Sequence, residues 1–212
     1  MSRIRTLSTS SGPARLHDDG HGARVLALGH GAGGGPDAPD LLAARDAALA
    51  LGWRVVRVEQ PWRVTGRRVA EAPLRLDAAW LAVLAGVERD LLVVGGRSAG
   101  ARVACRTAGA AGAAGVLALA FPLLAPSGRS RAAELTLPQV PVRVVQGARD
   151  AFGVPDGAHV VAGADHAFAV RRRDGRTERA VLDEVEAAVG TWLRALVPQT
   201  LVPRTLVPQT LT

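Results

Sequence analysis

The sequence predicts an α/β fold, in which a mostly parallel sheet is covered by helices on both faces. Short runs of continuously apolar residues alternate with longer segments of helical periodicity, and this alternation is typical of parallel strands buried on both sides. A chain of 212 residues is long enough for one such domain with a sizeable core and does not call for a second. We therefore expect a single domain over residues 1–195.

The predicted elements follow from the apolar runs and from the glycines and prolines between them. Residues 1–22 are polar and hold one or two edge strands around a turn at residues 11–13. Strands of buried type are expected at residues 24–29, 53–58, 91–94, 116–121, 142–146 and 159–161. Helices are expected at residues 40–51, 74–85, 99–107 and 178–196. Connections between the parallel strands should be right-handed.

The C-terminal residues have a composition of their own. From Leu196 onward, a five-residue unit of Leu-Val-Pro, then Gln or Arg, then Thr occurs three times. A proline in every unit removes backbone donors and prevents a helix, and so short a unit buries no core. We expect residues 196–212 to form a disordered, repetitive tail.

The chain is basic, with a formal net charge of +7, a property that can indicate nucleic acid or an anionic surface as a partner. The arginines are scattered, however, with a single run at residues 171–173, and the aromatic content is 3% with no tyrosine. Binding of unpaired bases relies on aromatic side chains among basic ones. We therefore expect no nucleic-acid partner.

Cysteine content and hydropathy indicate the compartment. The single cysteine, Cys105, excludes an internal disulfide framework, fits a reducing environment and is expected in the core. No apolar segment that resembles a signal peptide follows Met1. The uncharged residues 107–125 are rich in Ala and Gly and contain Pro122, so a helix end, a turn and a buried strand explain them better than a membrane span. We expect a cytoplasmic protein without a membrane partner.

One stretch, Gly95-Gly96-Arg97-Ser98-Ala99-Gly100, follows a predicted strand and precedes a predicted helix. This context is typical of a nucleophile elbow, in which the serine adopts a strained positive φ in a tight strand-to-helix turn. Gly96 and Gly100 leave room for that turn. Because the following helix begins at Ala99, its N-terminus points back at Ser98. Glycine is frequent in this chain, so a passive serine in a glycine-rich turn is the alternative interpretation.

Two further reactive residues follow predicted strands, where the crevice of such a sheet collects functional groups. Asp150 comes after the strand at residues 142–146, and His166 comes after the strand at residues 159–161. The order Ser98, Asp150, His166 is the order of nucleophile, acid and histidine in α/β-hydrolase triads. Three other residues could compete or assist: Asp165 as a second choice for the acid, His30 as a rival base that more plausibly shapes a loop, and His159 as a structural histidine.

With these motifs, the chain resembles the small lidless α/β-hydrolases of the dienelactone-hydrolase-like group, and specifically the KANL/Tex-type hydrolase domain. The resemblance rests on residues 29–34, 95–102, 121–123 and 145–153, together with Asp165-His166. Two departures stand out. Alanine occupies position 99, where such proteins often have methionine, and only about a dozen residues separate the strands around Val145 and His159, the lower limit for a parallel crossover. The usual helix there must be reduced to a turn or lost.

The resemblance implies a serine hydrolase that cleaves a small soluble ester or a similar acyl substrate. Ser98 would attack the carbonyl, His166 would move its proton, and Asp150 would orient the imidazole. The backbone N–H groups of Ala32 and Ala99 would form the oxyanion hole. The site loop would comprise His30, Gly31, Gly33 and Arg97. No metal or other cofactor is expected, and the 124–138 loop is too short for a lid; the oligomeric state stays open.

Two other functions compete with this interpretation. Residues 29–34 also match the pattern G-x-G-x-x-G, and Glu59 ends the next strand, as in a dinucleotide-binding fingerprint. Pro36 and Pro39, however, delay the helix whose N-terminus such a site needs. The second alternative is a catalytically silent α/β-hydrolase-like scaffold that acts as a binding or interaction module.

Overall fold

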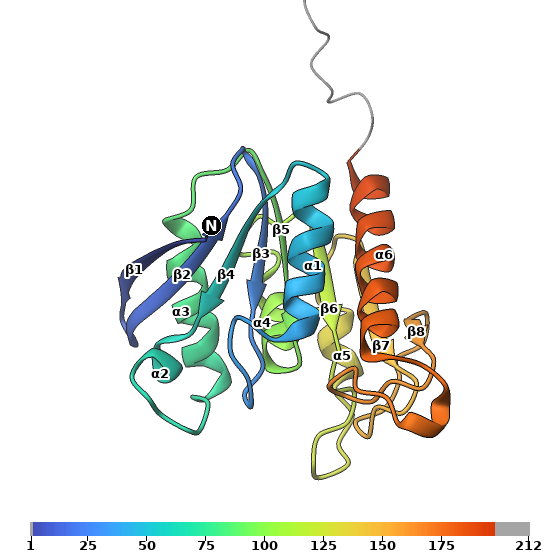
Figure 1. Ribbon diagram of the computed structural model, residues 1–212. Helices are drawn as coiled ribbons and strands as arrows, with labels where there is room; N and C mark the ends of the chain where they lie inside the picture. Colours follow the sequence, from blue (N-terminus) through green and yellow to red (C-terminus); the bar gives the residue numbers. More distant parts are fainter. Residues whose placement is uncertain (1, 198–212) are drawn as a thin grey trace, which may run out of the picture.

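The structure is a computed structural model that describes residues 2–197. It contains one eight-stranded sheet with the strand order β1-β2-β4-β3-β5-β6-β7-β8 (Figure 1). The strands are β1 (Arg3–Thr9), β2 (Gly12–Asp19), β3 (Arg24–Gly29), β4 (Arg54–Glu59), β5 (Leu91–Arg97), β6 (Gly115–Leu119), β7 (Val142–Gly147) and β8 (His159–Val161). The predicted mostly parallel sheet is confirmed, because the pairs from β4 through β8 are all parallel.

The polar N-terminal segment forms two strands around a turn, as predicted, and these strands pair as an antiparallel hairpin. β1 pairs with β2 around a turn in which Gly12 has φ +109°, and β2 pairs antiparallel with β4. Since β1 lies at the edge of the sheet and is largely exposed, it carries alternating polar side chains instead of a continuous apolar run. This hairpin extends the sheet at the end farthest from β8 (Figure 1).

Helices cover both faces of the sheet, as predicted. On one face, α1 (Pro39–Ala50) packs beside α6 (Glu178–Leu196); on the other lie α3 (Pro73–Ala85) and α4 (Ala99–Thr107) (Figure 1). Each face has its own apolar core, one centred on Leu41, Val93 and Val185 and the other on Trp80, Val94 and Ala104. Three short elements, α2 (Pro61–Val64), α5 (Ala132–Leu135) and the 3-10 turn η1 (Arg172–Asp174), lie outside the predicted helices.

Two connections bear directly on the site. The eleven residues between the ends of β7 and β8 (148–158) form turns without a helix, as the short spacing predicted. Between β6 and β7, the described chain holds only α5, so no lid domain covers the sheet there.

Residues 107–125 comprise the end of α4, turns, β6 and a short following segment. Among residues 2–197, no helix is both long and apolar enough to cross a membrane.

The predicted tail falls almost entirely outside the described residues. Leu196 was predicted both as the end of the last helix and as the first residue of the tail. It is the last residue of α6, and its side chain packs against the apolar core beside that helix. Residues 198–212 lie beyond the part of the chain that the structure describes.

Candidate active site

Ser98 lies in the turn between β5 and α4, with φ +52° and ψ −112°. A non-glycine residue rarely adopts this region, so the backbone is strained there. The neighbouring glycines make the turn possible: a Cβ atom on Gly96 or on Gly100 would collide with the carbonyl of Gly29 at the end of β3. The predicted elbow is therefore present. The close approach of β3, β5 and α4 depends on the two glycines.

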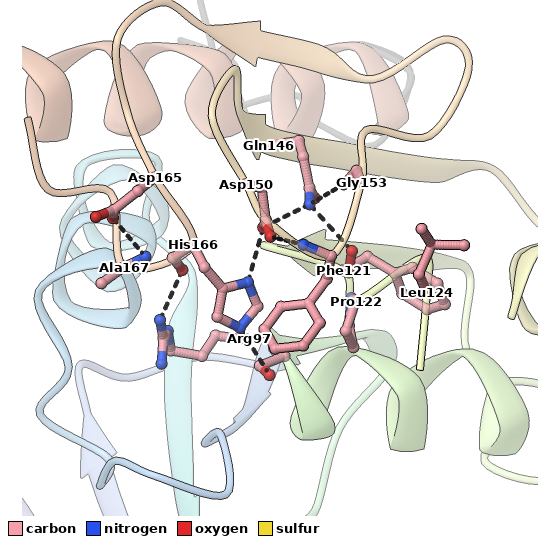
Figure 2. A network of polar contacts seen from close by, with 12 residues as sticks. Arg97, Phe121, Pro122, Leu124, Gln146, Asp150, Gly153, Asp165, His166 and Ala167 are labelled. Atoms are coloured by element: carbon pink, nitrogen blue, oxygen red, sulfur yellow. Dashed lines mark hydrogen bonds and ion pairs between the residues drawn. The ribbon is translucent and has the colours of Figure 1, made fainter. Parts of the chain in front are cut away.

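The structure brings Ser98, Asp150 and His166 together. Nδ1 of His166 lies 2.7 Å from Oδ2 of Asp150, and Nε2 lies 3.1 Å from Oγ of Ser98. The carboxylate of Asp150 can only accept a hydrogen bond, so Nδ1 carries the proton and Nε2 is free to accept from the hydroxyl. Figure 2 shows the His166 ring pointing at the Asp150 carboxylate.

Asp150 is held from several sides. Its side chain is fully buried, its Oδ1 accepts from the backbone N–H of Phe152 at 2.9 Å, and its Oδ2 accepts from the amide of Gln146 at 2.7 Å. The same amide nitrogen lies 3.0 Å from the Phe121 carbonyl and 2.9 Å from the Gly153 carbonyl (Figure 2). Sequence reasoning missed Gln146 as a site residue. A polar side chain at the end of an otherwise apolar strand was the available signal.

The turn that carries His166 is shaped by Asp165. Oδ1 of Asp165 accepts hydrogen bonds from the backbone N–H groups of Ala167 and Ala169, at 2.8 and 3.0 Å. The carboxylate of Asp165 is thus hydrogen-bonded within its own turn, and His166 pairs with Asp150. The alternative in which Asp165 pairs with the histidine ring is therefore wrong. On the other side, the ring of Phe152 meets the His166 ring edge-on, with 4.7 Å between the ring centroids.

Arg97 connects the elbow to two other segments. Its Nε donates to Oδ2 of Asp40 at 3.0 Å. Its NH2 group donates to the His166 carbonyl at 2.8 Å, a contact that Figure 2 shows. The Asp40 side chain, at the start of α1, is 2% exposed. Burial raises the pKa of Asp40, while the Arg97 guanidinium opposes that shift. Arg97 therefore ties the elbow to the start of α1 through the ion pair, and to the histidine loop through the hydrogen bond to the His166 carbonyl.

The glycine-rich loop after β3 lies against the elbow. Gly31 is buried against Ser98 and Arg97, whereas Ala32 and Gly33 are exposed. Ala32 and Ala99, whose N–H groups were predicted to form the oxyanion hole, line one common cavity. Gly31, which has no side chain, thus allows the loop backbone to lie against the elbow.

His30 anchors this loop and does not compete for the role of base. Its Nδ1 lies 2.8 Å from the Gly31 carbonyl, and its Nε2 accepts from the Gln60 backbone N–H at 3.1 Å. Both ring nitrogens are therefore occupied, with the proton on Nδ1. Burial lowers the pKa of His30, which favours the neutral ring. The predicted loop-shaping role fits these contacts.

The remaining candidates lie outside this constellation. His159 lies 3.3 Å from a Glu184 carboxylate oxygen on α6, consistent with a structural role. Cys105 is buried, and burial raises the pKa of its thiol to about 12. Among residues 2–197, no group of three or more His, Cys, Asp or Glu side chains is arranged to hold a metal ion.

The dinucleotide alternative does not fit this geometry. α1 begins at Pro39, beyond the glycine motif, so no helix N-terminus lies at the glycines where a pyrophosphate would need it. Glu59, which would have to bind a ribose, forms an ion pair with Arg15 at 3.0 Å.

Comparisons with known proteins agree with the fold. A family model described as an alpha/beta hydrolase domain matches residues 22–194. An alpha-beta serine hydrolase homologue from Coxiella burnetii superimposes with a TM-score of 0.72 at 19% identity, covering 91% of this chain and 98% of that one. A serine hydrolase without a lid from Xanthomonas campestris gives a TM-score of 0.69 at 22% identity, covering 90% and 94%.

A third solved structure, Est1E from Butyrivibrio proteoclasticus, gives a TM-score of 0.69 at 14% identity and covers 92% of this chain and 99% of its own. No curated protein sequence matches the chain. At these identities the structural likeness concerns the fold, and the predicted lidless α/β-hydrolase fold is confirmed.

Proposed function

We propose that this chain, which belongs to the alpha/beta hydrolase domain family, is a serine hydrolase. It cleaves a small soluble ester through an acyl-enzyme on Ser98. The observation that carries the proposal is the continuous hydrogen-bonded row from Asp150 through His166 to Ser98, with distances of 2.7 and 3.1 Å. A row of carboxylate, imidazole and hydroxyl in this order is the geometry that activates a serine.

In the first half of the reaction, Oγ of Ser98 bonds to the acyl carbon of the ester while its proton moves to Nε2 of His166. Asp150 stabilises the imidazolium that forms. The negative charge on the carbonyl oxygen meets the backbone N–H groups of Ala32 and Ala99. The bond to the leaving oxygen then breaks, and His166 returns the proton to that oxygen, which releases the alcohol.

In the second half, one water molecule gives a proton to Nε2 of His166 and its oxygen bonds to the acyl carbon. The bond to Oγ of Ser98 breaks, and the serine recovers its proton. The carboxylic acid leaves, so that ester and water have become acid and alcohol. Every step uses groups that the described chain supplies, and the mechanism calls for no metal and no organic cofactor.

An open site supports small, soluble substrates. The described segment between β6 and β7 contains only the four-residue helix α5, and the side chain of His166 is 24% exposed. We also propose that the protein is of the dienelactone-hydrolase-like, KANL/Tex type. It would be cytoplasmic and would have neither a nucleic-acid nor a membrane partner. The two solved neighbours that are named serine hydrolases support hydrolysis as the reaction class.

A fluorophosphonate probe tests the proposal directly, because it reacts with an activated serine and not with an ordinary hydroxyl. We expect stoichiometric labelling of Ser98, located by peptide mass spectrometry, that Ser98→Ala abolishes and His166→Ala weakens strongly. Ser127→Ala changes a serine in an exposed loop and serves as the matched control that keeps full labelling. A folded protein that stays unlabelled would instead favour the catalytically silent scaffold.

A further inference from the structure

A hollow that is open to solvent lies beside the glycine-rich loop. Its volume is about 370 Å³, and Ala32 and Gly33 form part of its lining. Gly31, the residue before them, lies against the elbow, because a Cβ atom on Gly31 would stand 3.4 Å from the Cβ of Ser98. A substrate whose carbonyl oxygen meets the N–H group of Ala32 therefore has this hollow within reach.

Three arginines, Arg63, Arg67 and Arg68, supply most of the polar lining, and we call this space the arginine hollow. The chain reverses at Gly66, which has φ +77°. The Gly66 N–H donates to the Arg63 carbonyl at 2.8 Å, and the Arg67 N–H donates to the Trp62 carbonyl at 2.9 Å. This pair of bonds is the Schellman arrangement at a helix end, and it directs Arg67 and Arg68 to the hollow.

A second hollow, of about 550 Å³, adjoins the first and shares Glu59 and Arg63 with it. Arg15, His17 and Asp37 also line this second hollow. Together the two linings include four arginines and two carboxylates. With the histidine neutral, the lining therefore carries an excess of two positive charges.

Two of the lining charges are paired with residues outside the hollows. Arg67 pairs with Glu71 at 3.0 Å, and Asp37 pairs with Arg57. Because one of these pairs neutralises a lining arginine and the other a lining carboxylate, the excess of two positive charges is unchanged.

The remaining carboxylate, Glu59, is shared by two arginines. Its Oε2 lies 3.0 Å from Arg15, and its Oε1 lies 3.8 Å from Nε of Arg63. Arg68 is exposed and forms no ion pair within residues 2–197. Arg63 and Arg68 therefore supply the positive charge that is left over in the hollow next to Ala32.

The loop backbone is bare where it borders the two hollows. Neither Gly33 nor Gly34 has a positive φ, and a Cβ atom on either would meet no atom within 4 Å. Neither backbone conformation nor packing therefore requires glycine at these two positions. Gly35 differs, since its Cβ would stand 3.3 Å from Nε of Arg63. Without side chains at positions 33 and 34, a ligand can approach the backbone closely.

We propose that the arginine hollow binds the phosphate group of a phosphorylated ester whose carbonyl carbon lies at Ser98. The inference rests on the proposed function and names its substrate class. A phosphate monoester carries about two negative charges near neutral pH, which matches the excess on the lining. The guanidinium groups of Arg63 and Arg68 donate to the phosphate oxygens, an arrangement for which the planar fork of arginine is well suited.

Three acetate esters with the same two-carbon alcohol test the charge preference. At pH 8, 2-hydroxyethyl acetate is neutral, 2-acetoxyethyl sulfate carries one negative charge and 2-acetoxyethyl phosphate carries about two. Methyl butanoate and methyl 3-phosphonopropanoate form a second series, in which the charge lies on the acyl half. Hydrolysis is followed by pH-stat titration, and each kcat/KM is divided by the rate constant for hydroxide-catalysed hydrolysis of the same ester.

We expect the corrected ratio of the doubly charged to the neutral ester to be about ten or more in one of the two series, with the sulfate between the extremes. Arg68→Met should lower that ratio by about five-fold, through KM more than through kcat. Because exposed charges are screened by salt, the ratio should also fall between about 0.02 M and 0.5 M sodium chloride.

Arg194→Met is the matched control. Arg194 is an exposed arginine near the end of α6 and lines a different hollow, between α1 and α6. Its removal lowers the net charge by the same amount as Arg68→Met and should leave the ratio unchanged. An equal fall in both variants would assign the preference to the net charge of the whole protein and would overturn the subsite.

Two other results overturn the subsite. One is a corrected ratio near one in both series, and the other is a sulfate hydrolysed as efficiently as the phosphate. In either case, hydrolysis of the neutral esters still upholds the proposed function.

A binding measurement separates the two proposals if no ester is hydrolysed. In Ser98→Ala protein, which has no nucleophile, calorimetry compares each doubly charged ester with its neutral partner, with and without Arg68→Met. Tighter binding of a charged ester that Arg68→Met weakens supports the subsite even where hydrolysis and probe labelling fail. Equal binding within both pairs overturns it.

Discussion

The side-chain amide nitrogen of Gln146 lies 2.7 Å from Oδ2 of Asp150, the same oxygen that accepts the hydrogen bond of His166. That amide also contacts the carbonyls of Phe121 and Gly153. The single side chain of Gln146, itself fully buried, thus joins the end of β7, the segment after β6 and the turn that carries Asp150. We infer that Gln146 positions the carboxylate against the imidazole.

The first prediction concerns that positioning role. Gln146→Met keeps a similar volume and removes the donor, so Asp150 and with it His166 should lose their fixed orientation. We expect kcat to fall by about 10²-fold, the cost typical of a misplacement near 1 Å at a reacting centre, with little change in KM. Steady-state kinetics on a short p-nitrophenyl ester measures this. Unchanged kcat in a folded variant would contradict the role.

The conservative variant Gln146→Glu adds a pH signature that a purely structural residue would not give. The new carboxyl lies beside the carboxylate of Asp150 and two backbone carbonyls, and like charge and burial both raise the pKa of the new group. While protonated, it can donate as the glutamine does. We expect near wild-type activity at low pH and a loss on the alkaline side that the wild type does not show.

The second prediction concerns the buried ion pair of Arg97 and Asp40. Arg97→Met leaves a buried carboxylate without its partner, which typically costs about 3–5 kcal/mol of unfolding free energy. The double variant Arg97→Met with Asp40→Leu removes both charges and should recover most of that stability in urea denaturation. Its activity should stay low, because the His166 carbonyl has lost the donor that lies 2.8 Å away.

Recovery of full activity in the double variant would show that Arg97 acts only through stability. Arg45→Met, a change at an exposed ion pair with the adjacent Asp46, serves as the matched control. Such surface pairs contribute about 0–1 kcal/mol, so neither unfolding nor kinetics should change appreciably.

Much of the fold could be predicted because its parallel strands are mostly apolar. Predicted and observed bounds coincide for β3, β8, α4 and α6, where apolar runs or helical periodicity end at glycine, proline or polar residues. β5 continues to Arg97, three residues beyond the prediction, because pairing with β6 extends through its two glycines to that residue. The short elements α2 and α5 carry no periodicity of their own and depend on neighbouring packing.

The reactive residues could likewise be predicted from the sequence, whereas the side chains that hold them in place could not. Ser98, Asp150 and His166 follow strand ends, and parallel strands present those ends on one edge. The ion pair of Arg97 with Asp40 joins residues far apart in the chain, and nothing local marks it. Similarly, the pairing of Gln146 with Asp150 depends on which way a strand-end side chain turns, and packing decides that.

The third prediction is a pH dependence of stability that arises from His30. Burial lowers the pKa of His30 below its ordinary value of 6.5, with Arg63 adding to the shift and Glu59 opposing it. The unfolded chain then binds this proton more readily than the folded chain. The free energy of unfolding should therefore be fully retained above about pH 6.5 and should decrease as the pH falls below it.

His30→Gln isolates this contribution, since an amide can still accept from the Gln60 N–H but does not titrate. Urea denaturation of both proteins between about pH 8 and pH 5 provides the comparison, and the other histidines are common to both. We expect a steeper loss of stability on acidification in the wild type. Parallel stability curves would contradict a neutral, buried His30.

The last prediction uses the strain at the elbow. Ser98 has φ +52°, and a residue with a Cβ atom pays about 1–3 kcal/mol in such a region, whereas glycine does not. Ser98→Gly should therefore be more stable than Ser98→Ala by about 1 kcal/mol, after the roughly 0.4–1 kcal/mol that glycine costs through the unfolded chain is subtracted. Both variants lack the hydroxyl, so the comparison removes any effect of the His166 hydrogen bond.

Ala101→Gly, inside α4 where an alanine is unstrained, should change stability in the opposite direction, because glycine in a helix interior is unfavourable. If glycine destabilised position 98 as it does position 101, the positive φ would not be a source of strain, and the serine would have to be held there by contacts that relieve it.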